Sequence, residues 1–212
     1  MKRYITFMVF IFLLAGCVSV PTSPTPRFYM LQSVAKNHVS GEFDVVSDVV
    51  VAVGPIKIPE YQDRPQIVTQ DKNGMLTFAQ FDRWGESLDQ GIQRVIVENL
   101  TIMLPKAVFG IFPCNHAIPV KYQVIADVIK LESDINGIMF LTVQWSVIDA
   151  RSNKMLFTKR SEFREQVNPH SYHGLAKTLS AECAYLSNKI SEALVLLETK
   201  DLPGGNNFSF QK

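Results

Sequence analysis

The chain has 212 residues, a formal net charge of +1 at neutral pH and 19% charged residues. A chain so close to neutral lacks the basic patch expected of a nucleic-acid-binding protein, and it has no basic stripe for anionic lipid headgroups. Its length suits one domain with a sizeable hydrophobic core.

Residues 1–17 have the pattern of an export signal followed by a lipid attachment site. Lys2 and Arg3 precede an apolar run from residue 5 to 14. As a helix, this run is too short to cross a bilayer about 30 Å thick. The run ends in Leu-Ala-Gly followed by Cys17, an order that resembles the lipobox of bacterial lipoproteins. The resemblance implies removal of residues 1–16 and acylation of Cys17, which would hold the protein on a membrane. An ordinary secretory signal with an incidental cysteine is the alternative.

The segment after Cys17 predicts a short tether. Residues 18–26 contain three prolines and little bulk, a composition that favours an extended, solvated chain of about 25 Å. A single α/β domain is predicted over residues 27–200. Residues 201–212, with their Pro-Gly-Gly-Asn-Asn sequence, are predicted to form a flexible tail.

The first half of the domain is predicted to contain short strands and one helix. Gly54-Pro55 is expected to end the second strand, with a loop up to residue 65. Asn73-Gly74 predicts a hairpin turn between the third and fourth strands. Apolar residues on a 3.6-residue period then predict an amphipathic helix that ends before Pro105. The expected strands are 27–31, 49–53, 66–70 and 76–80, and the expected helix is 86–104.

The second half predicts a meander followed by a longer helix. Residues 120–130, 139–149 and 155–165 alternate apolar and polar side chains and have short connections, as antiparallel strands do. Residues 171–198 carry an apolar stripe at helical spacing. We therefore predict an α/β two-layer sandwich, in which two long amphipathic helices cover one face of a mixed, mostly antiparallel sheet.

Two further cysteines, Cys114 and Cys183, leave two alternatives open. An exported protein meets an oxidising compartment, where such a pair can form a disulfide. The alternative is two separate thiols, with Cys183 as a small core residue of the second helix.

The sequence contains no recognisable catalytic or phosphate-binding motif. The serine-hydrolase elbow, the dinucleotide-binding turn and the P-loop are all missing from it. His116, His170 and His173 are weak zinc candidates, because no cluster of cysteines or carboxylates accompanies them. We therefore expect no catalytic residue, metal or cofactor, and an exported hydrolase is the poorer hypothesis.

Residues 53–86 are rich in the residue types that anchor protein interfaces. Tyr, Trp and Arg each combine a large buriable area with directional hydrogen bonding. Packing of Tyr61 and Trp84 on the core, with Arg64 paired to a nearby acid, is the alternative. Phe78 is a further aromatic residue of this segment. The predicted partner-binding residues are Tyr61, Arg64, Phe81, Arg83 and Trp84.

The same segment also carries a family resemblance. The stretches VGPIKIPEYQDRPQIVT and FAQFDRWGESLDQGIQRVIVENL resemble the hallmark blocks of the ABC-type transport auxiliary lipoproteins. Within that family they are most similar to the Pqi (paraquat-inducible) branch. RFYML after a proline-rich tether and a leucine-rich C-terminal helix fit the same pattern.

The resemblance implies a partner with MCE (mammalian cell entry) domains, which form tubes or rings that carry lipid between the inner and outer membranes. The chain would dock this partner at the periplasmic face of the outer membrane, self-associate as a ring and support envelope integrity. Val18, where an aspartate would retain a lipoprotein in the inner membrane, agrees with sorting to the outer membrane. The alternative is a lipid- or small-ligand-binding lipoprotein that works alone and buries an acyl chain between its helices and sheet.

Overall fold

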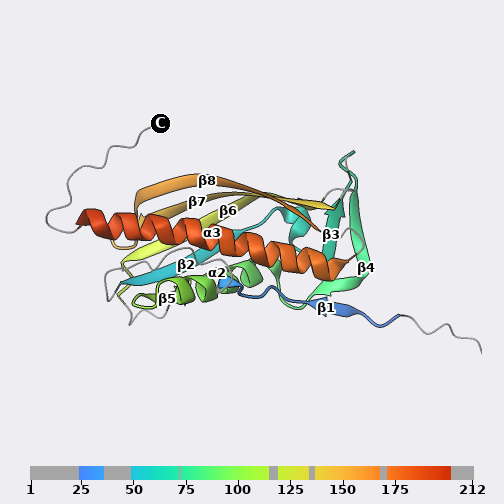
Figure 1. Ribbon diagram of the computed structural model, residues 1–212, viewed down its shortest axis with the longest axis horizontal. Helices are drawn as coiled ribbons and strands as arrows, with labels where there is room; N and C mark the ends of the chain where they lie inside the picture. The colour runs from blue at the N-terminus through green and yellow to red at the C-terminus, as the bar shows by residue number, and fades with distance from the viewer. Residues whose placement is uncertain are drawn as a thin grey trace, which may run out of the picture.

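Two β-sheets and two helices make up the fold in a computed structural model of the chain (Figure 1). The signal sequence, Cys17 and residues 202–212 of the predicted tail lie outside the residues that the structure describes. The described residues are 24–35, 49–71, 73–114, 119–133, 137–167 and 171–201.

The smaller sheet has three strands in the order β1-β4-β3. Its central strand, β4, pairs in parallel with β1 and antiparallel with β3. Strands β3 and β4 form a hairpin that stands at one end of the molecule, close to β1 (Figure 1). The bounds are Arg27–Tyr29 for β1, Gln66–Gln70 for β3 and Leu76–Trp84 for β4.

The larger sheet has five strands in the order β5-β2-β6-β7-β8. Strand β2 is parallel to both β5 and β6, and β6, β7 and β8 form the predicted antiparallel meander. The sheet is therefore mixed, as expected. The bounds are Val50–Lys57 for β2, Val108–Ile111 for β5, Tyr122–Ser133 for β6, Ile138–Asp149 for β7 and Lys154–Gln166 for β8.

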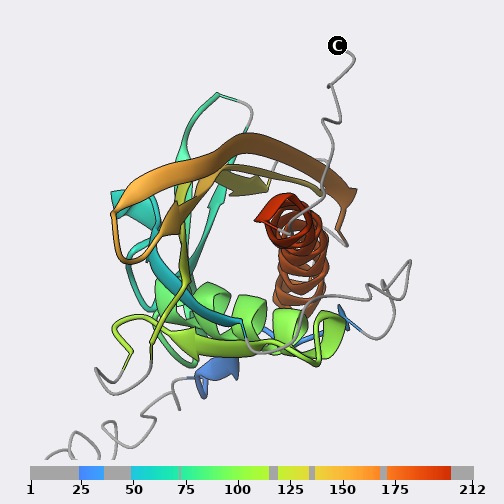
Figure 2. The same cartoon turned by 90° about the vertical axis from the view of Figure 1, so that its left-hand side faces the viewer.

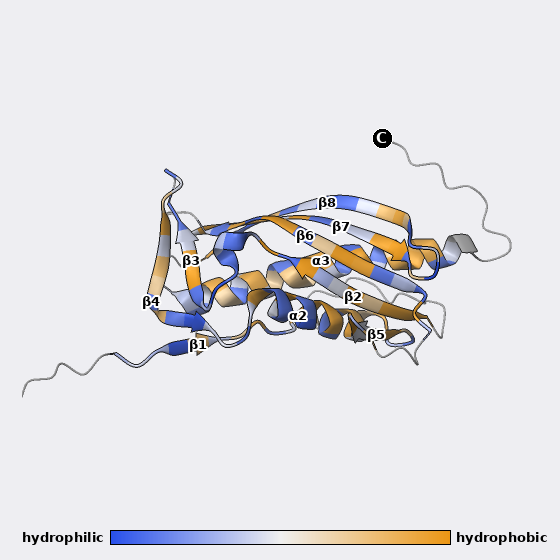
Figure 3. Cartoon of the chain, turned by 180° about the vertical axis from the view of Figure 1, so that it is seen from behind, coloured by the Kyte–Doolittle hydropathy of each residue, from blue (hydrophilic) through white to orange (hydrophobic). Residues whose placement is uncertain are grey.

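Helices α2 (Leu88–Met103) and α3 (Tyr172–Asp201) pack against each other and against the larger sheet, which curves around α3 (Figure 2). A short 3₁₀ turn, η3 (Glu60–Gln62), links β2 to β3. Seen from behind, α2 turns a largely polar face outward, as its amphipathic pattern predicts (Figure 3). Among the described residues, neither helix has the length and apolar character needed to cross a membrane.

The core lies between the helices and the larger sheet. Trp145 of β7 is 1% exposed, and its indole nitrogen donates a hydrogen bond to Ser161 Oγ of β8 at 3.0 Å. This bond satisfies the polar atom of a large buried side chain. The predicted helix stripes supply the opposite side of the core. Their fully buried members include Ile92, Val95, Ile96, Leu179, Cys183, Leu186 and Ile190, and Leu100 is buried with them.

The fold class is confirmed, but three details differ from the expectation. The strands divide into two sheets, and β5 lies in a stretch expected to be a loop. Strand β2 also continues past Gly54-Pro55 to Lys57, with a register shift between Val53 and Ile56. Gly54 permits this because its φ of +114° suits a residue without a Cβ, and an added Cβ would lie 2.1 Å from Gln93 Nε2.

The β3–β4 turn yields a first prediction. Gly74 has a φ of +85°, and Asp71 Oδ1 accepts hydrogen bonds from the backbone of Asn73 and Met75. Gly74→Ala is expected to lower the free energy of unfolding by about 1 kcal/mol, because alanine is strained at positive φ. Urea unfolding checks this, with Gly74→Asn expected to cost less because asparagine tolerates this conformation better. Equal losses in the two variants would contradict the explanation.

Candidate interaction surface and N-terminal strap

The chain enters the fold through residues 27–35, which we call the N-terminal strap. Arg27 makes a two-pronged ion pair with Asp82 of β4, with both N–O distances at 2.8 Å. The hydroxyl of Tyr29 donates a third hydrogen bond to the same carboxylate, also at 2.8 Å. Burial alone would raise the pKa of Asp82, but the hydrogen bonds from Arg27 and Tyr29 outweigh burial and lower it. Asp82 is therefore a buried, charged attachment point for the strap.

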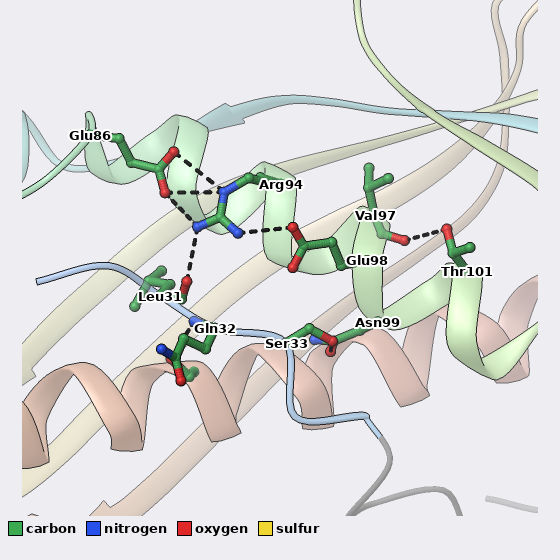
Figure 4. Close-up of polar contacts among 10 residues, drawn as sticks. Leu31, Gln32, Ser33, Glu86, Arg94, Val97, Glu98, Asn99 and Thr101 are labelled. Carbon is green, nitrogen blue, oxygen red and sulfur yellow. Dashed lines mark hydrogen bonds and ion pairs between the residues drawn. The ribbon is translucent and has the colours of Figure 1, made fainter.

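Arg94 of α2 ties the next part of the strap to the helix (Figure 4). Its Nη2 donates to the backbone oxygen of Leu31 at 2.9 Å. The same guanidinium is positioned by Glu86 and by Glu98, whose Oε1 lies 3.0 Å from Nη1. Because all of these groups are partly buried, the arrangement holds the strap more firmly than an exposed ion pair would.

The end of the strap contacts both helices. The backbone nitrogen of Gln32 donates to Ser180 Oγ of α3 at 3.1 Å, and Ser33 Oγ donates to Asn99 Oδ1 of α2 at 2.7 Å (Figure 4). Asn99 and Ala35 are fully buried. A force applied to the N-terminus is thus passed directly to α2, α3 and β4. These contacts join residues far apart in the chain, so no local sequence pattern predicts them.

The five predicted partner-binding residues do not share one surface. Trp84 is 6% exposed and belongs to the core, so it offers no surface to a partner. Tyr61, Phe81 and Arg83 are half-buried. Arg64 is exposed. The alternative role of Trp84 as a core residue is therefore the one seen in the structure.

Arg64 belongs to a surface that we call the hairpin patch, made of Arg64 and Phe78. The guanidinium carbon of Arg64 lies 4.6 Å from the centre of the Phe78 ring, which is the geometry of a cation–π contact. Phe78 is 46% exposed. An exposed Arg–aromatic pair is the composition of an interface anchor. Phe78 was not among the five predicted partner-binding residues, because the sequence does not show which aromatic side chain meets Arg64.

A second surface feature is a groove of about 540 Å³ between the N-terminal strap and the first turns of α3. Phe28 and Met30 are 65% and 52% exposed at its strap side. His173 and Lys177 are exposed on α3. No local sequence pattern predicts this groove either. It is lined by Phe28, Tyr29, Met30, Gln32, Val34, His173, Ala176, Lys177 and Ser180.

One small cavity lies beside Trp84 and is lined also by Gln62, Val68 and Leu131. It has a volume of about 10 Å³, which holds about one water molecule. This cavity is too small for an acyl chain, so a lipid carrier that works alone would need another site.

The two remaining cysteines are free thiols, so the disulfide left open by the sequence is not formed in this structure. Cys183 is fully buried in α3, and burial raises its pKa. Cys114 Sγ donates to the backbone oxygen of Ile111 at 3.4 Å. His116 and His170 lie outside the described residues, within which no group of three His, Cys, Asp or Glu side chains could hold a metal ion.

Glu182 of α3 is a buried acid that the sequence analysis missed. The residue is 0% exposed, and neither carboxyl oxygen has a hydrogen-bond partner among the described residues. Burial raises the pKa of Glu182 to about 8, and the negative charge of Glu165 on β8 adds to the effect. At neutral pH most molecules therefore hold this carboxyl in its neutral form.

Comparisons with known proteins agree with this fold. An uncharacterized protein of known structure aligns with a TM-score of 0.65 at 17% identity, over 81% of this chain and 99% of that one. Protein XCC0632 of Xanthomonas campestris aligns with a TM-score of 0.67 at 12% identity, over 82% and 98% of the two chains. At such low identity these likenesses concern the fold alone. No curated protein sequence matches the chain significantly.

The family is established by sequence. Residues 29–191, from the N-terminal strap to the last third of α3, match the family described as the ABC-type transport auxiliary lipoprotein component. The match spans both the strap and the hairpin patch. This protein is therefore a member of the ABC-type transport auxiliary lipoprotein family.

Proposed function

We propose that this protein is an outer-membrane lipoprotein of a Pqi-type transport system, and that it docks an MCE-domain partner in lipid transport between the two membranes. The observation that carries the docking role is the exposed Arg64–Phe78 pair of the hairpin patch. Membership of a transport auxiliary family implies a transporter partner. The MCE identity of that partner comes from the resemblance of the two sequence blocks. In this role the protein binds and positions its partner and supports envelope integrity without catalysing a reaction.

The hairpin patch suits docking for a physical reason. The patch stands on a hairpin at one end of the molecule, where a partner can approach without disturbing the core (Figure 1). An arginine already stacked on an aromatic ring loses little side-chain entropy when it is covered. Both side chains also present large areas that a partner can desolvate. The patch is therefore preorganised for binding.

The membrane side of the proposal rests on Cys17. Acylation of this residue would anchor the chain in the periplasmic leaflet of the outer membrane, and Val18 agrees with that destination. Sucrose-gradient fractionation of envelopes tests the location, and recovery in the inner membrane would contradict it. A ring-like homo-oligomer would match a symmetric MCE partner, and native mass spectrometry of the detergent-solubilised protein tests that assembly.

The docking role is tested by substitution within the hairpin patch. Arg64→Glu and Phe78→Asp are each expected to reduce recovery of the MCE-domain partner from solubilised envelopes by about tenfold or more, because they remove an interface anchor. Affinity purification followed by mass spectrometry measures the recovery. Both positions are exposed, so thermal unfolding should show a folded protein in each case.

Met155→Asp is the matched control for this experiment. Met155 is 56% exposed at the start of β8 and lies outside the hairpin patch. The control is expected to bind like the unaltered protein. Failure of the unaltered protein to recover any MCE-domain protein would overturn the proposed function. Equal losses in the control and the patch variants would overturn the assignment of the patch.

A further inference from the structure

We propose that the groove between the N-terminal strap and α3 is a membrane contact, in which Phe28 and Met30 insert into the lipid leaflet that holds the Cys17 anchor. The inference rests on the lipid anchor of the proposed function and adds a second point of attachment. It concerns a surface distinct from the hairpin patch. The contact is made by the described residues themselves and needs no partner protein.

The two apolar side chains are exposed on a rigidly held segment. Phe28 and Met30 flank Tyr29, and neighbouring side chains of an extended segment point to opposite sides. Tyr29 is held inward, because its hydroxyl bonds Asp82 and its backbone oxygen accepts a hydrogen bond from Gly85 at 2.8 Å. The outward direction of Phe28 and Met30 is therefore built into the strap. An exposed aromatic and a flexible methionine are side chains that suit the boundary between headgroups and acyl chains.

The charge of the groove also suits a membrane. Its lining includes the exposed Lys177 and contains no acidic residue. A cation beside an exposed apolar pair complements the negative surface of a leaflet that contains anionic phospholipid. Lys177 would therefore add to the apolar insertion of Phe28 and Met30 without a long basic stripe.

A short stretch of chain separates the anchor from the groove. An extended chain over residues 18–26 spans about 25–30 Å, and Phe28 follows these residues almost directly. The groove is thus the part of the described fold that the tether keeps nearest the membrane. A single lipid anchor leaves the domain free to rotate relative to the membrane. A second contact favours one orientation, because the anchor already holds that contact close to the leaflet. Insertion of Phe28 and Met30 would therefore orient the domain on its leaflet.

Tryptophan fluorescence with brominated lipids tests the proposal on the full acylated protein. Phe28→Trp is reconstituted in vesicles of phosphatidylethanolamine and phosphatidylglycerol, with and without bromine on the acyl chains. Bromine quenches only an indole that reaches the chains. We expect emission from the added tryptophan to fall about twofold in brominated vesicles, because a side chain inserted 5–10 Å deep lies beside the bromines.

Met155→Trp is the control, because its exposure of 56% is close to that of Phe28. Met155 follows the β7–β8 turn. In this turn the backbone nitrogen of Ala150 donates to the backbone oxygen of Lys121, and the side chain of Lys121 forms an ion pair with Glu198 near the end of α3. The strap contacts α3 at Ser180, and residues 180 and 198 lie about 27 Å apart along a helix. Trp84 and Trp145 are buried and contribute the same background to both variants.

Each outcome of the experiment supports or overturns the membrane contact of the groove. Selective quenching of Phe28→Trp, reduced by Lys177→Glu or by omission of phosphatidylglycerol, supports a contact with an anionic leaflet. Equal quenching at both positions, or none at residue 28, overturns the groove proposal while leaving docking untouched. A response of Phe28→Trp only after addition of the MCE-domain partner would make the groove a protein site and also overturn it. A protein that does not float with the vesicles contradicts the lipid anchor, and the groove proposal with it.

Discussion

Glu182→Met is expected to raise the free energy of unfolding by about 4 kcal/mol at pH 8 and to remove most of its dependence on pH between 5 and 8. The folded protein holds the Glu182 proton with a pKa of about 8, well above the usual value of 4.5 for glutamate. The unfolded chain releases this proton at lower pH. The stability that depends on the proton is therefore fully present below about pH 4.5 and is lost as pH rises through 8.

The physical reason is a buried carboxyl without partners. Both oxygens of Glu182 are enclosed and unbonded among the described residues, so ionisation there is not offset by any hydrogen bond. A methionine of similar length fills the same space without a polar group. Glu182→Gln is expected to flatten the pH dependence as well, but with a smaller gain in stability because its amide is still buried.

Urea unfolding between pH 5 and pH 9 measures this effect. Glu192→Gln is the matched control, since Glu192 lies on the same helix, is exposed and pairs with Lys189. We expect this control to keep the slope of the unaltered protein. A stability that is flat with pH in the unaltered protein, or a slope that survives Glu182→Met, would contradict the assignment.

Asp82→Ala is expected to release the N-terminal strap and lower the free energy of unfolding by about 2 kcal/mol. Asp82 is 4% exposed and receives hydrogen bonds from Arg27 and Tyr29, so its removal leaves the partly buried Tyr29 hydroxyl without its partner. Hydrogen–deuterium exchange measures the release, with faster exchange expected over residues 27–35. Strands β6 and β7, in the larger sheet, should keep their protection.

Asp127→Ala is the control for this prediction. The Lys57–Asp127 pair is also an ion pair between strands, but its N–O distance is 3.9 Å and its side chains are 76% and 58% exposed. Such a pair contributes little, so we expect a change within about 0.5 kcal/mol and no effect on the strap. Similar losses for Asp82→Ala and Asp127→Ala would mean that burial does not decide the strength of the strap contact.

The proposed membrane anchor and the proposed docking patch are connected through β4. The strap pairs with β4, and β4 also carries Phe78 of the hairpin patch. The most direct path for a load between the anchor and a docked partner would therefore include the short parallel β1–β4 pair and the Asp82 ion pair. We expect Asp82→Ala to impair function even where partner binding in detergent is unchanged.

The sequence by itself determined the elements whose pattern is local. The 3.6-residue period identified both helices, and the alternation of apolar and polar residues identified β6, β7 and β8 to within three residues at either end. These patterns are readable because each element buries one face along its whole length. The two stretches that resemble the family are also contiguous, and the family match over residues 29–191 confirms the family.

Only the tertiary structure decided which side chains of residues 53–86 face solvent. Arg64 and Trp84 both suited an interface by type, yet Trp84 lies in the core while Arg64 stacks on exposed Phe78. The register between β3 and β4 shifts between Gln66 and Val68, so simple alternation does not predict the exposed side. The burial of Glu182 could not be predicted from the sequence for a similar reason. Its burial depends on the sheet packed against α3, and contacts between residues distant in the chain leave no local pattern to read.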